Sequence, residues 1–237
     1  MNLTKRKKHI KDVLIKSSIE KNKSYDIKEA LDVLKSIQKL KFKDLESFDV
    51  SIQLGIDATK SDQIIKSSTI LPHGNGKKIR IAVFADGVDE KEALESGADK
   101  VGMEDLFNEI KSGATNYDVI VARLDTMKYI SKLGPILGPR GLMPSIKTGT
   151  LTSNVKKSVE NIKNGQIKYK TEKNGIIHCS IGKVNFVNVK IKQNLEKLLS
   201  DIKKLKPATS KGLFIRKVVI STTMGPGISV KKESLEF

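Results

Sequence analysis

Apolar residues recur at helical spacing near the start of the chain and predict two amphipathic helices, over residues 4–23 and 27–40. Ser24 and the residues after it offer an N-cap for the second helix. Polar and apolar residues then alternate with a period of two over 47–54, which indicates a half-buried strand. The polar segment 57–68 is expected to lead out of this first part of the fold.

The middle of the chain alternates apolar strand segments with helical ones. We expect strands at 78–85, 100–102 and 117–122, and helices at 89–96, 104–111, 126–132 and 155–164. This order predicts a parallel, Rossmann-like, three-layer α/β unit. A nucleotide site there is disfavoured, because the turn Asp86-Gly87 after the first strand lacks a glycine series.

The last part of the chain again favours an antiparallel sheet. Segments 166–170 and 176–181 flank the turn Lys173-Asn-Gly175 and predict a β-hairpin. A lysine-rich helix follows over 189–206, and the final strand covers 213–220. One N-terminal and three C-terminal strands would form a small antiparallel sheet with helices on one face. The predicted fold class is therefore α/β, with an α+β split domain and an inserted α/β domain.

Charge supports the same division. The net charge is +17, and Lys/Arg exceed Asp/Glu by 15 to 10 over 1–67, 13 to 11 over 68–159 and 16 to 6 over 160–237. This distribution predicts that 1–67 and 160–237 form one discontinuous basic domain, with 68–159 inserted, although a lysine-rich composition could also produce it by accident. The excess of positive charge indicates a polyanionic partner, either nucleic acid or an acidic membrane surface.

Several classes of protein are disfavoured. No apolar run reaches the roughly 20 residues of a membrane span, and Met1–His9 lacks the apolar segment of a signal peptide, so we expect a cytoplasmic protein. A lipid-surface protein would need exposed aromatics, but only 5% of residues are aromatic and none is Trp. The single Cys179 is expected to face the core. We expect no catalytic residue, no metal and no cofactor.

Residues 133–149 contain four glycines and three prolines. They predict an ordered loop without helix or strand, in which Gly134 and Gly138 are extended before their prolines. Two interpretations remain open, a rigid connector and a phosphate cradle of backbone amides. The nucleotide P-loop pattern does not fit, because Gly141 is followed by Leu142.

The run Gly-Pro-Ile-Leu-Gly-Pro-Arg-Gly-Leu-Met-Pro at 134–144, followed by Lys147-x-Gly-Thr, resembles the signature of the ribosomal protein L-one family. Supporting blocks cover nearly the whole chain in the family's order. They are Leu3–Arg6, Leu54–Asp57 with Lys60–Gln63, Leu71–Lys77 with Ala82–Ala85, and Ser221–Gly227.

The resemblance implies an RNA site at the Thr-Met-Gly element, at the entrance of the first strand and on the predicted hairpin. The implied RNA-binding residues are Lys41, Phe42, Glu46, Ser47, Lys168, Lys170, Thr222, Thr223, Met224, Gly225 and Pro226. The two threonines would supply hydroxyl donors, and Met224 an apolar surface for a sugar or base. Phe42 is further from Glu46 than in the family's pattern, so it either contacts the RNA or caps the core.

The resemblance further implies a ribosome-bound structural constituent of the large subunit, not an enzyme. Its expected partners are the rRNA of the mobile stalk, tRNA leaving the exit site and the mRNA of its own operon, whose translation it would repress. The alternative function is a nucleotide-dependent RNA-modifying enzyme that uses the middle unit. The missing phosphate loop argues against this alternative.

Overall fold

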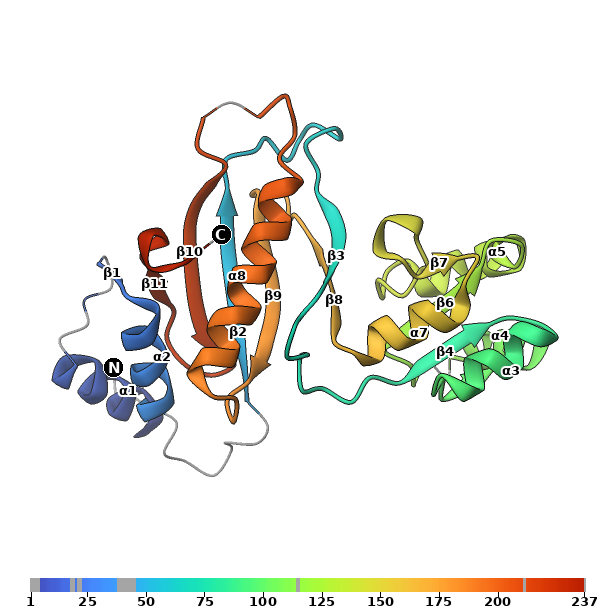
Figure 1. Ribbon diagram of the computed structural model, residues 1–237, viewed down its shortest axis with the longest axis horizontal. Helices are drawn as coiled ribbons and strands as arrows, with labels where there is room; N and C mark the ends of the chain where they lie inside the picture. Colours follow the sequence, from blue (N-terminus) through green and yellow to red (C-terminus); the bar gives the residue numbers. More distant parts are fainter. Residues whose placement is uncertain are drawn as a thin grey trace. The chain divides into compact units, whose positions relative to one another are not determined.

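The computed structural model describes residues 5–17, 20, 23–37, 46–113, 116–210 and 212–236. The chain forms two compact units. Unit 1 contains residues 1–76 and 167–237, and unit 2 contains residues 77–166. The chain therefore leaves unit 1, forms unit 2 and returns, as the order of colours in Figure 1 shows.

Unit 1 is built on a five-stranded sheet with the order β1-β11-β10-β2-β9. The strands are β1 (Ser24–Tyr25), β2 (Ser47–Leu54), β9 (Ile176–Lys183), β10 (Ile215–Thr222) and β11 (Ile228–Val230). The pairs β10–β2 and β2–β9 are antiparallel, as predicted, whereas β1 pairs parallel with β11 at one edge. The sequence did not predict β1 and β11, which have only two and three residues.

Helices α2 and α8 pack on this sheet and share one core with it (Figure 1). The helical elements of unit 1 are α1 (Lys5–Lys16), α2 (Ile27–Ile37), α8 (Asn188–Lys204) and the 3-10 turn η3 (Lys232–Ser234). The period of two in β2 buries Phe48, Val50, Ile52 and Leu54, while Gln53 is exposed. Each such side chain contributes about 1.5–3 kcal/mol when fully buried. The amphipathic pattern thus fixes which face of the sheet carries the helices.

The predicted pairing of 166–170 with 176–181 is wrong, although the turn between them forms: the Glu172 amide donates to the Ile176 carbonyl (2.9 Å) and the Gly175 amide to the Glu172 carbonyl (2.9 Å). Strand β8 (Gln166–Lys170) instead pairs with β3 (Lys66–Ile70) in a separate two-stranded sheet, and one bridge, Thr171 to Ile177, links it to β9. The Ile65 amide donates to Thr171 Oγ1 (3.1 Å), and the Thr171 amide donates to the Ile65 carbonyl (2.9 Å). A long-range partner therefore turns part of a polar segment, expected to be a connector, into a strand.

Unit 2 contains a four-stranded, fully parallel sheet with the order β5-β4-β6-β7. Its strands are β4 (Ile81–Phe84), β5 (Lys100–Val101), β6 (Val119–Arg123) and β7 (Leu151–Thr152). Its longer helices are α3 (Val88–Glu95), α4 (Glu104–Lys111) and α7 (Val155–Lys163), and its short helical turns are α5 (Met127–Ile130), η1 (Ser131–Leu133), α6 (Gly134–Leu137) and η2 (Ile146–Thr148). The predicted parallel α/β order is confirmed.

Alternate residues of β4 enter two cores on opposite faces of this sheet. Ala82 and Phe84 pack with Leu106 of α4 and Ile130 of α5. Ile81 and Val83 pack with α3 and α7. Because β4 is buried on both faces, its residues form a continuous apolar run, as expected for a parallel sheet. The predicted three-layer arrangement follows from these two cores.

The prediction that residues 133–149 contain no helix is wrong, because α6 forms there. Gly134 (φ −48°, ψ −45°) and Gly138 (φ −60°, ψ −56°) are helical, not extended. Pro135 lies in the first turn, where its missing N–H costs no hydrogen bond. Gly134 has no Cβ to clash with the following proline ring. Leu137 is buried, and Leu142 packs against the same core, so the segment is anchored to unit 2.

Asn194 of α8 anchors the segment that leaves unit 1. Its side chain is fully buried, and its amide nitrogen donates to the Gly74 carbonyl (3.0 Å) and the Ile181 carbonyl (2.8 Å). Its Oδ1 accepts from the His73 amide (3.1 Å).

The charge pattern predicts that the chain divides after residues 67 and 159. The compact units of the structure instead divide after residues 76 and 166.

Candidate nucleic-acid interface

The start of β2 and the end of β10 meet at one end of the unit 1 sheet, where Phe48 lies opposite Thr222 (Figure 1). The Thr223 amide donates to the Ser47 carbonyl (3.1 Å), and the Ser47 amide donates to Thr223 Oγ1 (3.0 Å). The Thr223 hydroxyl also lies 3.4 Å from the Ser47 carbonyl. These contacts lock two segments that are far apart in the sequence.

A tight turn follows β10 and presents Met224 to solvent. The Gly225 amide donates to the Thr222 carbonyl (3.0 Å), and the Met224 side chain is 59% exposed. A Cβ added to Gly225 would lie 2.2 Å from Thr222 Oγ1. The turn therefore requires glycine at this position.

The hydroxyl of Thr222 is unusual in this turn. Thr222 is 2% exposed, and its Oγ1 has no hydrogen-bond partner among the residues that the structure describes. A buried hydroxyl without a partner costs about 1–3 kcal/mol. Both threonines were expected to offer hydroxyls to RNA. The Thr223 hydroxyl is already hydrogen-bonded to Ser47, whereas the Thr222 hydroxyl is bonded to no described residue.

The structure brings together only part of the predicted site. Glu46 and Ser47, both buried, lie at the same end of the sheet as Thr222–Pro226. Lys168 and Lys170 belong to β8, in the two-stranded sheet of unit 1. Lys41 and Phe42 lie outside the described residues. The predicted residues therefore form two groups, which we call the turn site (Glu46, Ser47 and Thr222–Pro226) and the β8 lysines (Lys168 and Lys170).

Two further lysines accompany these groups, and neither was singled out from the sequence. Lys183 of β9 lies opposite Ser47 and adds a positive charge beside the turn site. Lys66 of β3 lies close enough to Lys168 to disfavour its charge. Burial and this like charge lower the pKa of Lys168 to about 8. Only the strand pairing places these two lysines beside the predicted residues, and that pairing was not predicted from the sequence.

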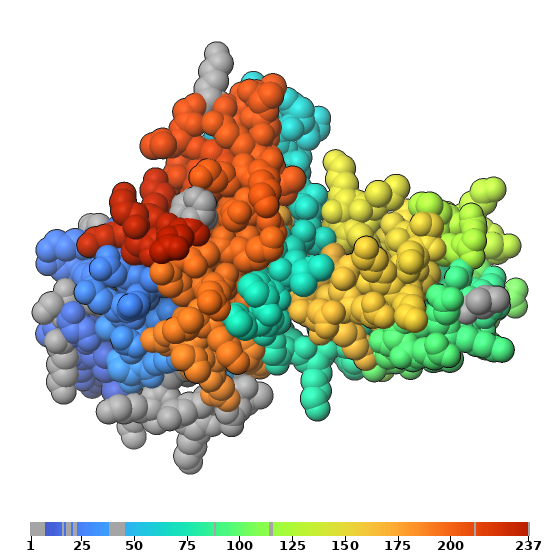
Figure 2. Space-filling model, viewed as in Figure 1, coloured from blue at the N-terminus to red at the C-terminus, as the bar shows by residue number. Residues whose placement is uncertain are grey.

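Charge is concentrated in unit 1. Its residues 1–76 and 167–237 contain 30 Lys/Arg and 15 Asp/Glu, whereas residues 77–166 contain 14 and 12. Figure 2 shows the C-terminal segment (red) beside the N-terminal helices (blue) in the same unit, in agreement with the pairing of β1 with β11. Segments from both ends of the chain therefore form one basic body.

The described part of the chain offers little support for a metal site, a reactive thiol or a membrane span. No group of three or more His, Cys, Asp or Glu side chains there could hold a metal ion. Cys179 packs against the core of unit 1, as predicted, and burial raises the pKa of its thiol to about 12. None of the described helices is both long and apolar enough to cross a membrane.

Comparison with known proteins confirms the resemblance. The model of the "Ribosomal protein L1p/L10e family" matches residues 33–226. "Large ribosomal subunit protein uL1" of Methylococcus capsulatus is 51% identical over 233 residues, 98% of each chain. The same-named proteins of Pseudomonas fluorescens (50% over 234 residues, 99% of this chain and 98% of the relative) and Haemophilus influenzae (52% over 221 residues, 93% and 96%) are equally similar. The chain therefore belongs to the ribosomal protein L1p/L10e family.

Proposed function

We propose that the protein is a structural constituent of the large ribosomal subunit and binds the rRNA of its mobile stalk. One observation carries this proposal. Relatives that are about half identical over nearly their whole length bear the name of a large-subunit protein. The charge of unit 1 agrees, because an RNA backbone requires a basic partner.

The turn site is the proposed contact for rRNA. The exposed Met224 offers an apolar surface to a sugar or base. Gly225 permits the tight turn that presents Met224, because a Cβ there would overlap Thr222 Oγ1. Thr223 holds the turn against Ser47, and the Thr222 hydroxyl is the group that has no partner among the described residues. In this proposal Thr223 positions the turn rather than donating to the RNA.

The finer functions form the second part of the proposal. The protein would assist release of tRNA from the exit site, and it would repress its own operon mRNA through an RNA hairpin that resembles the rRNA site. We assign phosphate contacts to the β8 lysines, with Lys66 beside them. If one surface binds both messenger and rRNA, an excess of the rRNA stalk fragment should displace the mRNA leader in a competition assay.

Filter binding to the isolated rRNA stalk fragment tests the main proposal. Residues 1–76 joined to 167–237 should retain most of the affinity of the full chain, because they carry nearly all of the excess charge. Affinity should also fall steeply with salt, with a log–log slope of several units. Equal affinity of residues 77–166 alone, or a flat response to salt, would contradict the proposal.

Lys168 should make RNA binding depend on pH. Its pKa of about 8 means that it loses its charge as the pH rises from 7 to 9. If the RNA binds only the charged form, affinity should fall roughly tenfold over this range, and it should fall much less in Lys168→Arg, which stays charged. Lys170→Arg is the matched control and should behave like the wild type. Parallel pH curves for the wild type and Lys168→Arg would remove Lys168 from the site.

The same pKa has a consequence for folding. Between pH 8 and the ordinary lysine pKa of 10.5, the unfolded chain keeps the Lys168 proton while the folded chain loses it. The contribution of Lys168 to the free energy of unfolding therefore rises with pH in this window.

A further inference from the structure

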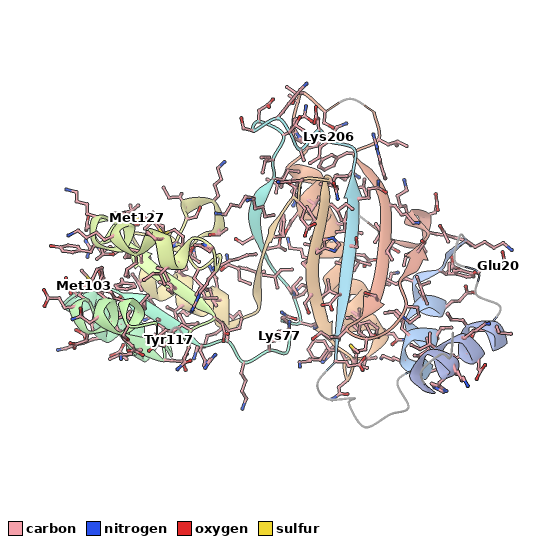
Figure 3. The ribbon with its side chains drawn as sticks, turned by 180° about the vertical axis from the view of Figure 1, so that it is seen from behind. Glu20, Lys77, Met103, Tyr117, Met127 and Lys206 are labelled. Atoms are coloured by element: carbon pink, nitrogen blue, oxygen red, sulfur yellow. The ribbon has the colours of Figure 1, made fainter. Side chains whose placement is uncertain are left out.

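Unit 2 contains a cavity of about 680 Å³ that the RNA-binding proposal does not use. Its apolar walls are formed by Phe84, Met103, Phe107 and Tyr129, and Asp86 and Glu104 stand at its exposed edge. Met103 is labelled in Figure 3, on the same unit as Tyr117 and Met127. The Tyr129 ring is 58% exposed, so a large apolar surface faces the opening.

The cavity lies where the parallel sheet reverses its strand order. Phe84 is the last residue of β4, Met103 follows β5, and Tyr129 lies in α5 after β6. The chain passes from β4 to β5 on one side and then to β6 on the other side of β4. Parallel α/β sheets typically bind ligands at the carboxyl ends of their strands at such a reversal. The fold thus places the cavity at a position suited to a ligand.

The chemistry of the cavity disfavours a phosphate ligand. A phosphate would meet the carboxylates of Asp86 and Glu104, and the Asp86-Gly87 turn has no glycine series to bring amides near it. Lys132, which also lines the cavity, lies with its Nζ 5.9 Å from the centroid of the Tyr129 ring and interacts with the ring face. RNA and nucleotides are therefore unsuited to this site.

The segment that supplies most of the lining of the cavity is acidic in an otherwise basic protein. Residues 86–125 contain 11 Asp/Glu and four Lys/Arg, whereas residues 126–166 contain one and seven. Asp89 pairs with Arg123 and Glu109 with Lys100, but Asp86 and Glu104 form no ion pair with any described residue. These two carboxylates outnumber the one lysine, Lys132, that lines the same cavity. At an apolar opening they favour a ligand that combines a cation with an apolar group.

We propose that this cavity docks a basic segment of another protein, in which arginines flank a large apolar side chain. The apolar side chain enters between Phe107 and Tyr129, and an arginine pairs with Asp86 and Glu104. The acidity continues beyond the cavity into the first turns of α3 and α4, so an extended segment gains more from it than a small amine does. This interaction is independent of the proposed RNA binding.

Fluorescence anisotropy with the full chain tests the proposal. The probe is a short fluorescein-labelled peptide of Arg-Phe-Leu-Arg repeats, and the comparison is the same peptide with Glu in place of Arg. At near-physiological salt we expect the arginine peptide to bind saturably and the glutamate peptide not to bind. The double variant Asp86→Asn, Glu104→Gln should weaken it by roughly tenfold or more, because both carboxylates pair with the arginine. Tyr129→Ala, at an exposed ring, should weaken it by about fivefold.

Matched controls separate a specific site from general acidity. The double variant Glu92→Gln, Glu95→Gln removes the same charge from exposed positions of α3 outside the cavity, and it should change binding by less than about twofold. Lys132→Ala should tighten binding, because it removes a positive charge that repels the incoming arginine. Melting curves of each variant establish that unit 2 stays folded.

Four results would overturn the proposal. They are no saturable binding, equal binding of the glutamate peptide, equal losses in the two double variants, and displacement of the peptide by the rRNA stalk fragment. The last result would mean that the cavity belongs to the RNA surface. Normal RNA affinity in the Asp86, Glu104 variant, together with weakened peptide binding, would support a separate protein-docking site.

Discussion

Replacement of Asn194 by alanine is expected to lower the melting temperature of unit 1 by roughly 6–12 °C. The substitution removes three hydrogen bonds that the fully buried Asn194 side chain makes to two carbonyls and one amide of the chain. We expect a loss of about 3 kcal/mol, and each kcal/mol shifts the midpoint by about 2–4 °C in a domain of this size. Thermal unfolding followed by circular dichroism measures the shift.

The neighbouring Gln193 supplies the control. Its side chain also contacts His73, through the imidazole, but both groups are exposed. Gln193→Ala should therefore change the free energy of unfolding by less than about 0.5 kcal/mol. Similar melting temperatures for the two variants would show that burial of Asn194 does not decide the stability of this segment.

Replacement of Gly225 by valine is expected to weaken binding of the rRNA stalk fragment by roughly two orders of magnitude. The new Cβ would overlap the buried Thr222 Oγ1, so the turn must move and the exposed Met224 must move with it. A loss of about 3 kcal/mol corresponds to a little more than a hundredfold in affinity. Filter binding, at a temperature where melting curves show the variant folded, measures the effect.

Gly102→Val is the matched glycine substitution. Gly102 lies in unit 2, its φ is not in the left-handed region, and a Cβ there would meet nothing within 4 Å. This variant should bind the RNA like the wild type. If Gly225→Val bound within about threefold of Gly102→Val, the turn site would have to be withdrawn as the RNA contact.

The sequence predicted the elements whose side chains repeat regularly. The alternation in β2 and the apolar face of α8 are local patterns, and the structure buries the residues that these patterns select, such as Ile52 and Leu198. The continuous apolar run of β4 likewise predicted a strand, which the structure buries on both faces. Periodicity therefore sufficed for the fold class and for the order of elements in unit 2.

Pairing between distant segments could not be predicted in this way. Strand β8 satisfied the local rule for a hairpin, but Ile65 and Thr171, far apart in the sequence, direct it to β3. The helical Gly134 shows a competing local effect, because glycine before proline tolerates the conformation that other residues avoid. In both cases the rule applied to the sequence omits a second effect, which is long-range strand pairing for β8 and the missing Cβ for Gly134.

The candidate site shows the same limit. The residue types of Thr222–Pro226 pointed to a turn with hydroxyl groups, and the turn is present. The Thr223 hydroxyl, not that of Thr222, is hydrogen-bonded to Ser47. The sequence could not show this, because Ser47 and Thr223 come together only in the folded sheet. The resemblance selected the residues, whereas their division between positioning and contact required the structure.

The position of β2 between β9 and β10 has a consequence for the order of folding during synthesis. Both partners of β2 come from the C-terminal part of the chain, whereas unit 2 is contiguous. A nascent chain can therefore complete unit 2 while β2 still lacks both neighbours, and such long-range pairing is slow to form. The basic surface of unit 1 therefore forms only after β9 and β10 have been synthesised, so the growing chain acquires its capacity to hold RNA later than it completes unit 2.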